Sequence, residues 1–442
     1  MIDRSTASSF QRSAHWVLLI VFNLFILVSW MPRITTIGGT DIGVSAVLLA
    51  MMVPLLLVLP NQTQLDEQAR HLGIAIFACL SLVIFWGYLG MYRLDNPMRA
   101  GRLLLSLGQG IIIVLVVTRL LSPRAIQFSL AICTLMLTFV GILSLYGYLG
   151  GQPVTLTYLQ RDRSSGLFKN PNQYGMIASM AVPFAAACFF QYKRRWLAVF
   201  LLLAAWVALL MAASKTNMVI ALLTMMMTLT FGLLSAKRGV FLLAVFPAIA
   251  GFIYFGGMPI LEFFNPRAAG IIQDMISGGS GESNTVDQRM ELWSYSVHVM
   301  QTSPWFGEGT GVPIDVITQT HSHSHNVFLD LGRTVGIPGL LGSLLFMILI
   351  TWLAFRTLAK VAAISQQHGE FMHGRAVVIG AAFSAISYML SNQMSDSLGP
   401  STSVFLWLCL GLLLKRHEIL FRWPMSHLQR SNSAIRQKIV RA

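Results

Sequence analysis

Three histidines alternate with serines in residues 321–326, which read His-Ser-His-Ser-His-Asn, at the end of a long polar segment in an otherwise apolar chain. Histidine is the side chain whose ordinary pKa lies closest to neutrality, so it suits a general base or a proton carrier. Polar, titratable groups at the mouth of a membrane domain are costly to desolvate, and they usually mark a place of chemistry or transport. A proton-transfer role is therefore the favoured interpretation.

Two other interpretations of these histidines stay open. A zinc site would need a third or fourth ligand and a dry shell, but no Cys lies nearby. The carboxylates Glu308, Asp315 and Asp330 show no ligand spacing typical of a metal site. The histidines could also be surface residues at the start of a helix. We expect neither a metal nor a cofactor.

Composition excludes a soluble protein. The chain has 442 residues, of which 55% are hydrophobic and 11% charged, with a mean hydropathy of +0.66. A soluble domain carries about 25% charged residues. The four cysteines all fall inside apolar runs and are expected to be buried thiols without a disulfide framework.

The apolar runs predict an all-α polytopic membrane protein with about twelve spanning helices, since each span needs about 20 apolar residues. The first run is expected to be a retained signal anchor. The predicted spans are residues 15–32, 42–60, 72–91, 102–120, 126–149, 173–191, 196–213, 216–235, 239–259, 326–355, 376–395 and 401–414.

This pattern divides the chain into four parts. Residues 1–259 hold nine spans and an outer loop at 150–172, and residues 260–325 form a long outer loop. Residues 326–414 hold three further spans, and residues 415–442 form a basic tail.

Charge predicts the orientation. With the N-terminus inside, 20 of the 31 Lys and Arg residues lie on the cytoplasmic side, as the positive-inside rule requires. Both termini are then cytoplasmic, and most of the charge behind the net +14 faces anionic inner-leaflet lipid, which explains it without nucleic acid.

The basic residues left outside oppose this bias, so they are candidates for a functional role. Pairing with lipid headgroups or with nearby aspartates is the alternative, although exposed pairs are worth little. These outer basic residues include Arg161, Arg163, Lys169, Lys215 and Arg289.

The long loop is expected to contain a helix. Val286, Met290, Trp293 and Val297 recur at helical spacing, which predicts an amphipathic helix on the outer membrane boundary. Trp293, Tyr295 and Trp305 suit such an interface. Pro304 is expected to end this helix, before a tight glycine-rich turn at 307–311.

The sequence around these residues resembles the O-antigen ligase and polymerase family, and especially its ligases. The family motif is His followed by Asn, Ser or Gln, nine further residues, and Gly-x-x-Gly. Here His325-Asn326 is followed by nine residues and then by Gly336-Ile337-Pro338-Gly339. His323 lacks this spacing, because Val335 stands where the glycine should be.

Three upstream segments support the resemblance. Residues 289–293 resemble the family's Arg-x-x-x-Trp element, residues 304–309 its Pro-x-x-Gly-x-Gly element, and residues 163–172 its Arg-x-x-Gly-x-Phe-x-Asn-Pro-Asn loop. One departure is Ser214-Lys215-Thr216, where the family often has Ser-Arg-Gly. Lysine keeps the charge but lacks the bidentate fork of arginine.

The resemblance implies a GT-C-like glycosyltransferase at the periplasmic face of the bacterial inner membrane. It would move O-antigen glycan from undecaprenyl diphosphate to a sugar hydroxyl of lipid A-core, with inversion and without a metal, in lipopolysaccharide biosynthesis. It implies catalytic roles for His325 and Arg289. The implied contacts to diphosphate or acceptor are Arg163, Arg161, Lys169, Lys215, His323 and Asn326.

Other functions remain open. An O-antigen polymerase shares the donor and differs in the acceptor, and a protein O-oligosaccharyltransferase is a third possibility. A lipid-linked glycan flippase belongs to another class, and it would favour charged or broken helices at mid-membrane and two similar halves. No internal repeat is evident in the sequence.

Overall fold

The computed structural model describes part of the chain, and all structural statements below concern this part. The described residues are 4–29, 36–37, 40–41, 44–59, 65–91, 97–149, 158–160, 163–166, 171–191, 195–233, 262, 269–270, 273, 283–309, 312, 314–316, 319–321, 324, 326–368, 375–392 and 400–422.

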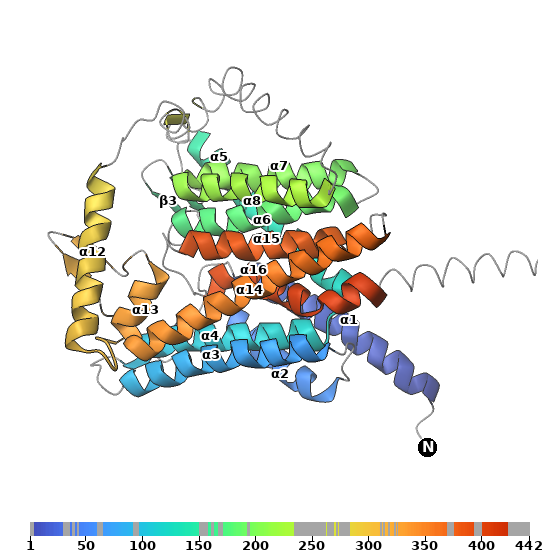
Figure 1. Cartoon of the computed structure of the whole chain (residues 1–442). Helices are drawn as coiled ribbons and strands as arrows, with labels where there is room; N and C mark the ends of the chain where they lie inside the picture. Colours follow the sequence, from blue (N-terminus) through green and yellow to red (C-terminus); the bar gives the residue numbers. More distant parts are fainter. Residues whose placement is uncertain are drawn as a thin grey trace, which may run out of the picture.

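The protein is a bundle of long apolar helices that lie side by side (Figure 1). The helices of the N-terminal half are α1 (Arg4–Ser29), α2 (Val44–Val58), α3 (Glu67–Met91), α4 (Pro97–Arg119), α5 (Pro123–Leu149), α6 (Pro171–Gln191), α7 (Arg195–Ala212) and α8 (Lys215–Leu233). Those that follow are α12 (Ser283–Thr302), α13 (Val327–Val335), α14 (Ile337–His368), α15 (Arg375–Asn392), α16 (Pro400–Leu414) and a π-helical turn, η2 (Glu418–Arg422).

The helix starts follow from local sequence. Helices α4, α5, α6 and α16 each begin with a proline, whose fixed φ suits the first helical position and whose missing N–H would have had no partner there. Asp66 Oδ1 accepts from the Ala69 N–H at 2.6 Å and so caps α3.

Helix α6 lies at the centre of the bundle and packs against α7, α8 and α15. Its residues 174–188 are buried, and small side chains allow close approach. Polar groups inside the bundle pair with one another, as Ser179 Oγ does with Ser387 Oγ at 3.1 Å, and Ser384 Oγ donates to the Met180 carbonyl at 2.7 Å. These bonds join α6 to α15.

The outer surface of the bundle is apolar. Leu57 is 82% exposed, and Leu203 and Ile348 are each 61% exposed. Such a surface would be unfavourable in water but suits lipid. Four helical stretches are long and apolar enough to cross a membrane: 67–90, 123–143, 195–212 and 337–364. Five shorter apolar helices accompany them, so the chain is a helical membrane protein.

The ninth predicted span, 239–259, lies outside the described residues. Each of the other eleven overlaps a helix. The total of twelve spans and the GT-C-like class stay predictions.

The prediction of one continuous helix over 326–355 is wrong. The structure has two helices there, because Gly336, with a φ of +81°, leaves the helical conformation and ends the first helix. Helix α13 is short and amphipathic, whereas α14 is the long apolar one.

Three two-stranded antiparallel hairpins connect the helices. They are β1 (Thr36–Ile37) with β2 (Thr40–Asp41), β3 (Tyr158–Gln160) with β4 (Arg163–Gly166), and β5 (Ile314–Val316) with β6 (Gln319–His321). Strand β4 contacts α5, α6 and α7.

Helix α12 runs across one end of the bundle, roughly perpendicular to the long helices, with α13 beside it (Figure 1). It is the helix predicted in the long loop, and it ends at Thr302, before Pro304. Trp86, near the C-terminal end of α3, bonds the Trp305 carbonyl and stacks on Phe306. This end of the bundle holds the candidate site.

Candidate active site

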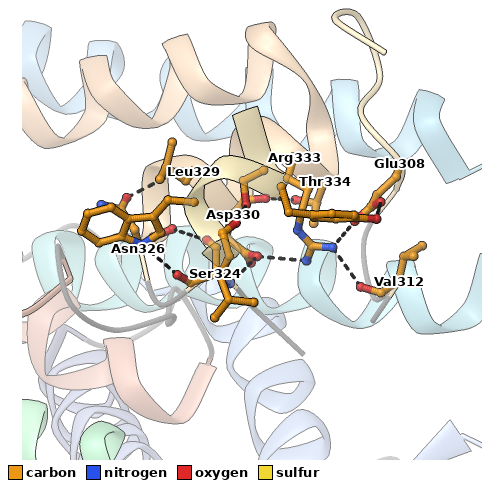
Figure 2. A network of polar contacts seen from close by, with 12 residues as sticks. Glu308, Val312, Ser324, Asn326, Leu329, Asp330, Arg333 and Thr334 are labelled. Carbon is orange, nitrogen blue, oxygen red and sulfur yellow. Dashed lines mark hydrogen bonds and ion pairs between the residues drawn. The ribbon is translucent and has the colours of Figure 1, made fainter. Parts of the chain in front are cut away.

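Asn326 caps helix α13. Its backbone is extended, with φ −144° and ψ 118°, and its side-chain Oδ1 accepts from the N–H groups of Phe328 at 3.0 Å and Leu329 at 3.2 Å (Figure 2). An Asn side chain at this position satisfies two of the N–H groups that a helix start leaves unpaired. The structure thus gives Asn326 a structural role, and its contact with substrate stays a prediction.

Ser324 is fully buried and is fixed through its side chain and both of its backbone polar groups. Its N–H donates to Asp330 Oδ1 at 3.2 Å, and its Oγ donates to the Asn326 carbonyl at 3.0 Å. Its own carbonyl accepts from Trp293 Nε1 of α12 at 3.0 Å. Ser324 immediately precedes His325 in the chain, so the residue next to the predicted base is held in place.

A buried arginine connects the elements around this segment (Figure 2). Arg333, on α13, is 1% exposed and pairs through Nη1 with Glu308 and through Nη2 with Asp330 at 2.9 Å. Its Nη1 also donates to the Val312 carbonyl at 3.0 Å. Tyr295 of α12 donates to the second oxygen of Glu308 at 2.9 Å. A buried cation is costly to desolvate unless it is paired and hydrogen-bonded, and here it is both.

The turn after α12 fits closely against the junction between α13 and α14. The Glu308 N–H donates to the Arg333 carbonyl at 2.9 Å, and the Ile337 N–H donates to the Pro304 carbonyl at 2.8 Å. Gly307 and Gly336 have φ of +61° and +81°, which favours glycine. The Pro-x-x-Gly-x-Gly and Gly-x-x-Gly segments therefore pack on one another.

Arg289 lies on α12 and is partly buried. It precedes Trp293 by four residues, so the two side chains share a face of the helix. Trp293 is the residue that bonds Ser324, so α12 holds Arg289 on the side that meets the segment leading to His325.

The three aromatic residues predicted at the membrane boundary differ in their contacts, and their interface role stays a prediction. Trp293 and Tyr295 use their polar atoms inside the protein, on Ser324 and Glu308. Trp305 is 64% exposed and still suits a membrane boundary.

Lys215 is the first residue of α8 and is partly buried. The preceding turn is tight: Ala213 has a φ of +45°, which is uncommon for a residue with a side chain. Asn217 Nδ2 donates to Ser214 Oγ at 3.0 Å and to the Asn172 carbonyl at 3.2 Å. These bonds place Lys215 beside the start of α6, where the 150–172 loop ends.

Of the remaining predicted site residues, Arg163 alone lies in the described part of the chain. Arg163 begins strand β4, whose backbone pairs with β3. His325, His323, Arg161 and Lys169 lie outside the described residues. Among the described residues, no group of three or more His, Cys, Asp or Glu could hold a metal ion.

Sequence reasoning did not identify the roles of Glu308, Asp330 and Arg333. One signal for part of this network was present: Asp330 and Arg333 carry opposite charges three residues apart, a spacing at which helix side chains meet. Glu308 lies 25 residues from Arg333, and nothing in the sequence pairs the two.

The fold and site define a helical membrane protein with a polar site at one end of the bundle. Residues 197–344 match a family model described as O-antigen ligase. This region begins in α7, ends in α14, and contains Lys215, Arg289 and His325. This region therefore resembles the O-antigen ligase family, as the motifs predicted, and the match supports a ligase- or polymerase-type function in O-antigen assembly for lipopolysaccharide biosynthesis. No curated protein matches the chain.

Proposed function

We propose that this protein is an O-antigen ligase that transfers glycan from undecaprenyl diphosphate to a sugar hydroxyl of lipid A-core. The observation that carries the proposal is the bond from Trp293 to Ser324. It joins the helix of Arg289 to the segment preceding His325, and both lie in the region that matches the ligase family. A cation for the diphosphate and a base for the acceptor are the two groups that this transfer requires.

The reaction that we propose is a single displacement. His325 orients the acceptor hydroxyl and takes its proton as the hydroxyl oxygen attacks the anomeric carbon of the donor sugar. The bond between this carbon and the diphosphate oxygen breaks, and undecaprenyl diphosphate leaves with the electron pair. Attack from the opposite side inverts the anomeric configuration.

The leaving diphosphate needs cationic contacts. We assign this role to Arg289 and Arg163, with Arg161, Lys169 and Lys215 in support. The planar arginine fork matches phosphate oxygens with two parallel hydrogen bonds. His323 and Asn326 would assist on the acceptor side, next to His325.

We further propose that the site faces the periplasm and that both termini face the cytoplasm. Arg70 lies in the first turn of α3, whereas Trp86 near the other end of α3 meets the site. Lys415 bonds the Leu121 carbonyl in the turn between α4 and α5, next to Arg119 and Arg124. Basic residues thus gather at the end opposite α12, and by the positive-inside rule this supports a cytoplasmic location for that end.

The role of Arg289 can be tested by Arg289→Lys. Lysine keeps the positive charge but cannot form the bidentate contact, so we expect transfer to fall by tenfold or more, since each charged hydrogen bond is worth about 1.5–3 kcal/mol. The measurement is the initial rate with purified protein in nanodiscs, lipid-linked glycan and lipid A-core. Arg70→Lys, on an exposed arginine at the far end of the bundle, is the matched control. Equal rates for Arg289→Lys and wild type would exclude a bidentate contact.

We expect transfer to persist in the presence of a chelator. A carrier diphosphate is already an activated leaving group, and arginine contacts can stabilise its charge as it departs. The same assay, run with and without EDTA after dialysis against the chelator, measures this. Loss of activity that a divalent cation restores would contradict the metal-independent mechanism.

A further inference from the structure

We propose that Asp330 and Arg333 are positioning residues for the transfer reaction, because they fix the backbone at Ser324 directly before the base. This inference rests on the proposed function of His325 and adds two residues to it. Both lie among the nine residues between Asn326 and Gly336 whose identity the family motif does not specify, and neither side chain is proposed to touch substrate.

The first step of the argument is the contact between Asp330 and Ser324. Asp330 Oδ1 accepts the Ser324 N–H at 3.2 Å. The same oxygen accepts from Arg333 Nη2 at 2.9 Å, so Arg333 orients the carboxylate that Ser324 uses. The Asp330 backbone is fixed separately, because its N–H donates to the Asn326 carbonyl at 2.9 Å in the first turn of α13.

The second step is that Arg333 is itself fixed from the opposite side. Its Nη1 group donates to Glu308 Oε1 and to the Val312 carbonyl, and Tyr295 of α12 donates to the other carboxylate oxygen of Glu308, Oε2. The guanidinium, with 1% exposure, therefore connects α12, the turn after it and α13. A planar group with five donors can meet these acceptors together, whereas the ammonium of lysine cannot.

The third step is that α12 reaches the same residue by a separate route. Trp293 donates to the Ser324 carbonyl at 3.0 Å. Both backbone polar groups of Ser324 are therefore fixed by side chains of different helices. Misplacement of a reacting group by about 1 Å can cost about 10²-fold in rate. A network that sets the Ser324 backbone would thus contribute to kcat without contacting the donor.

The test compares Asp330→Ala with Asp330→Asn. Alanine removes the acceptor of the Ser324 N–H while Arg333 keeps Glu308 as its partner, and asparagine retains an acceptor oxygen. We expect kcat to fall by about 10²-fold in Asp330→Ala and by less in Asp330→Asn, with an unchanged KM for the donor. Hydrogen exchange at the Ser324 amide should accelerate in the same order.

Arg333→Lys provides a second variant, with Arg124→Lys as its control on an exposed arginine at the opposite end of the bundle. We expect Arg333→Lys to lower kcat and to accelerate hydrogen exchange at the Ser324 amide, and we expect Arg124→Lys to change neither. Size-exclusion chromatography checks that Asp330→Ala, Asp330→Asn and Arg333→Lys are folded. If one of them is not, the other two are used for the test. Two results would overturn the inference. In the first, hydrogen exchange at the Ser324 amide accelerates in the variants but kcat stays at the wild-type value. In the second, kcat falls in proportion to the melting temperature while the Ser324 amide stays protected from exchange.

His325→Gln, measured in parallel, separates this inference from the proposed function. An active His325→Gln protein would refute the assignment of the base. An inactive one, together with a fully active Asp330→Ala protein, would refute the positioning role alone.

Discussion

Replacement of His325 by alanine should reduce the rate of glycan transfer by about 10²–10⁴-fold, the range that a general base contributes. The reason is that no other group would take the proton from the acceptor hydroxyl as it attacks. His325→Gln should lose as much, because glutamine can hydrogen-bond the hydroxyl but cannot accept its proton at neutral pH. The measurement is the single-turnover rate with lipid-linked glycan bound to the enzyme.

His298→Ala is the matched control for this experiment. His298 is an exposed histidine on α12, nine residues after Arg289 and therefore on the opposite face of the helix. Its loss should leave the rate unchanged. Near-wild-type transfer by His325→Ala would show that the base is another residue.

The second large effect is expected on stability, at Gly336. A side chain there would need a φ of +81° with a ψ of −175°, a backbone conformation that essentially only glycine adopts and that costs about 1–3 kcal/mol. Its Cβ would also lie 2.5 Å from the Trp305 carbonyl carbon. Overpacking of this kind costs typically about 1–3 kcal/mol more. Gly336→Ala should therefore lower the melting temperature of the purified protein and reduce transfer, since the junction of α13 with α14 supports the site.

Gly307→Ala should behave similarly, because its Cβ would overlap the Arg333 carbonyl oxygen at a φ of +61°. Gly108→Ala serves as control: Gly108 lies within α4 with open space around its Cα. Alanine there should leave stability unchanged or raise it by about 0.5–1 kcal/mol. A Gly336→Ala protein as stable as Gly108→Ala would contradict the close packing of the turn on this junction.

The long helices could be predicted because each one spans an apolar run of the length that a bilayer needs. The break at Gly336 could not be predicted in this way, because Val335 and Ile337 continue the apolar pattern on both sides of it. In the structure the run divides into two helices at Gly336, which has a positive φ, and the next N–H, that of Ile337, bonds the Pro304 carbonyl. An apolar run predicts a helix, but it does not predict where that helix ends and a second one begins.

The site could be predicted in part. The motifs selected Arg289 and His325, whose roles stay predictions, and the structure links the helix of Arg289 to Ser324, the residue before His325, through Trp293. The ion pair of Arg333 with Glu308 was not predicted, since it depends on how the turn after α12 packs on α13. Pairing between residues far apart in sequence arises from tertiary packing, which a single sequence does not display.

The function that we propose for this protein is to join completed O-antigen to lipid A-core. The most direct test is a lipopolysaccharide gel, together with analysis of lipid-linked glycans, from a strain that lacks the protein and from the same strain complemented with wild type or His325→Ala. We predict rough lipopolysaccharide and full-length glycan stranded on undecaprenyl diphosphate, restored only by the wild type. Lipopolysaccharide capped by a single repeat would instead identify a polymerase, and an unchanged gel would contradict both assignments.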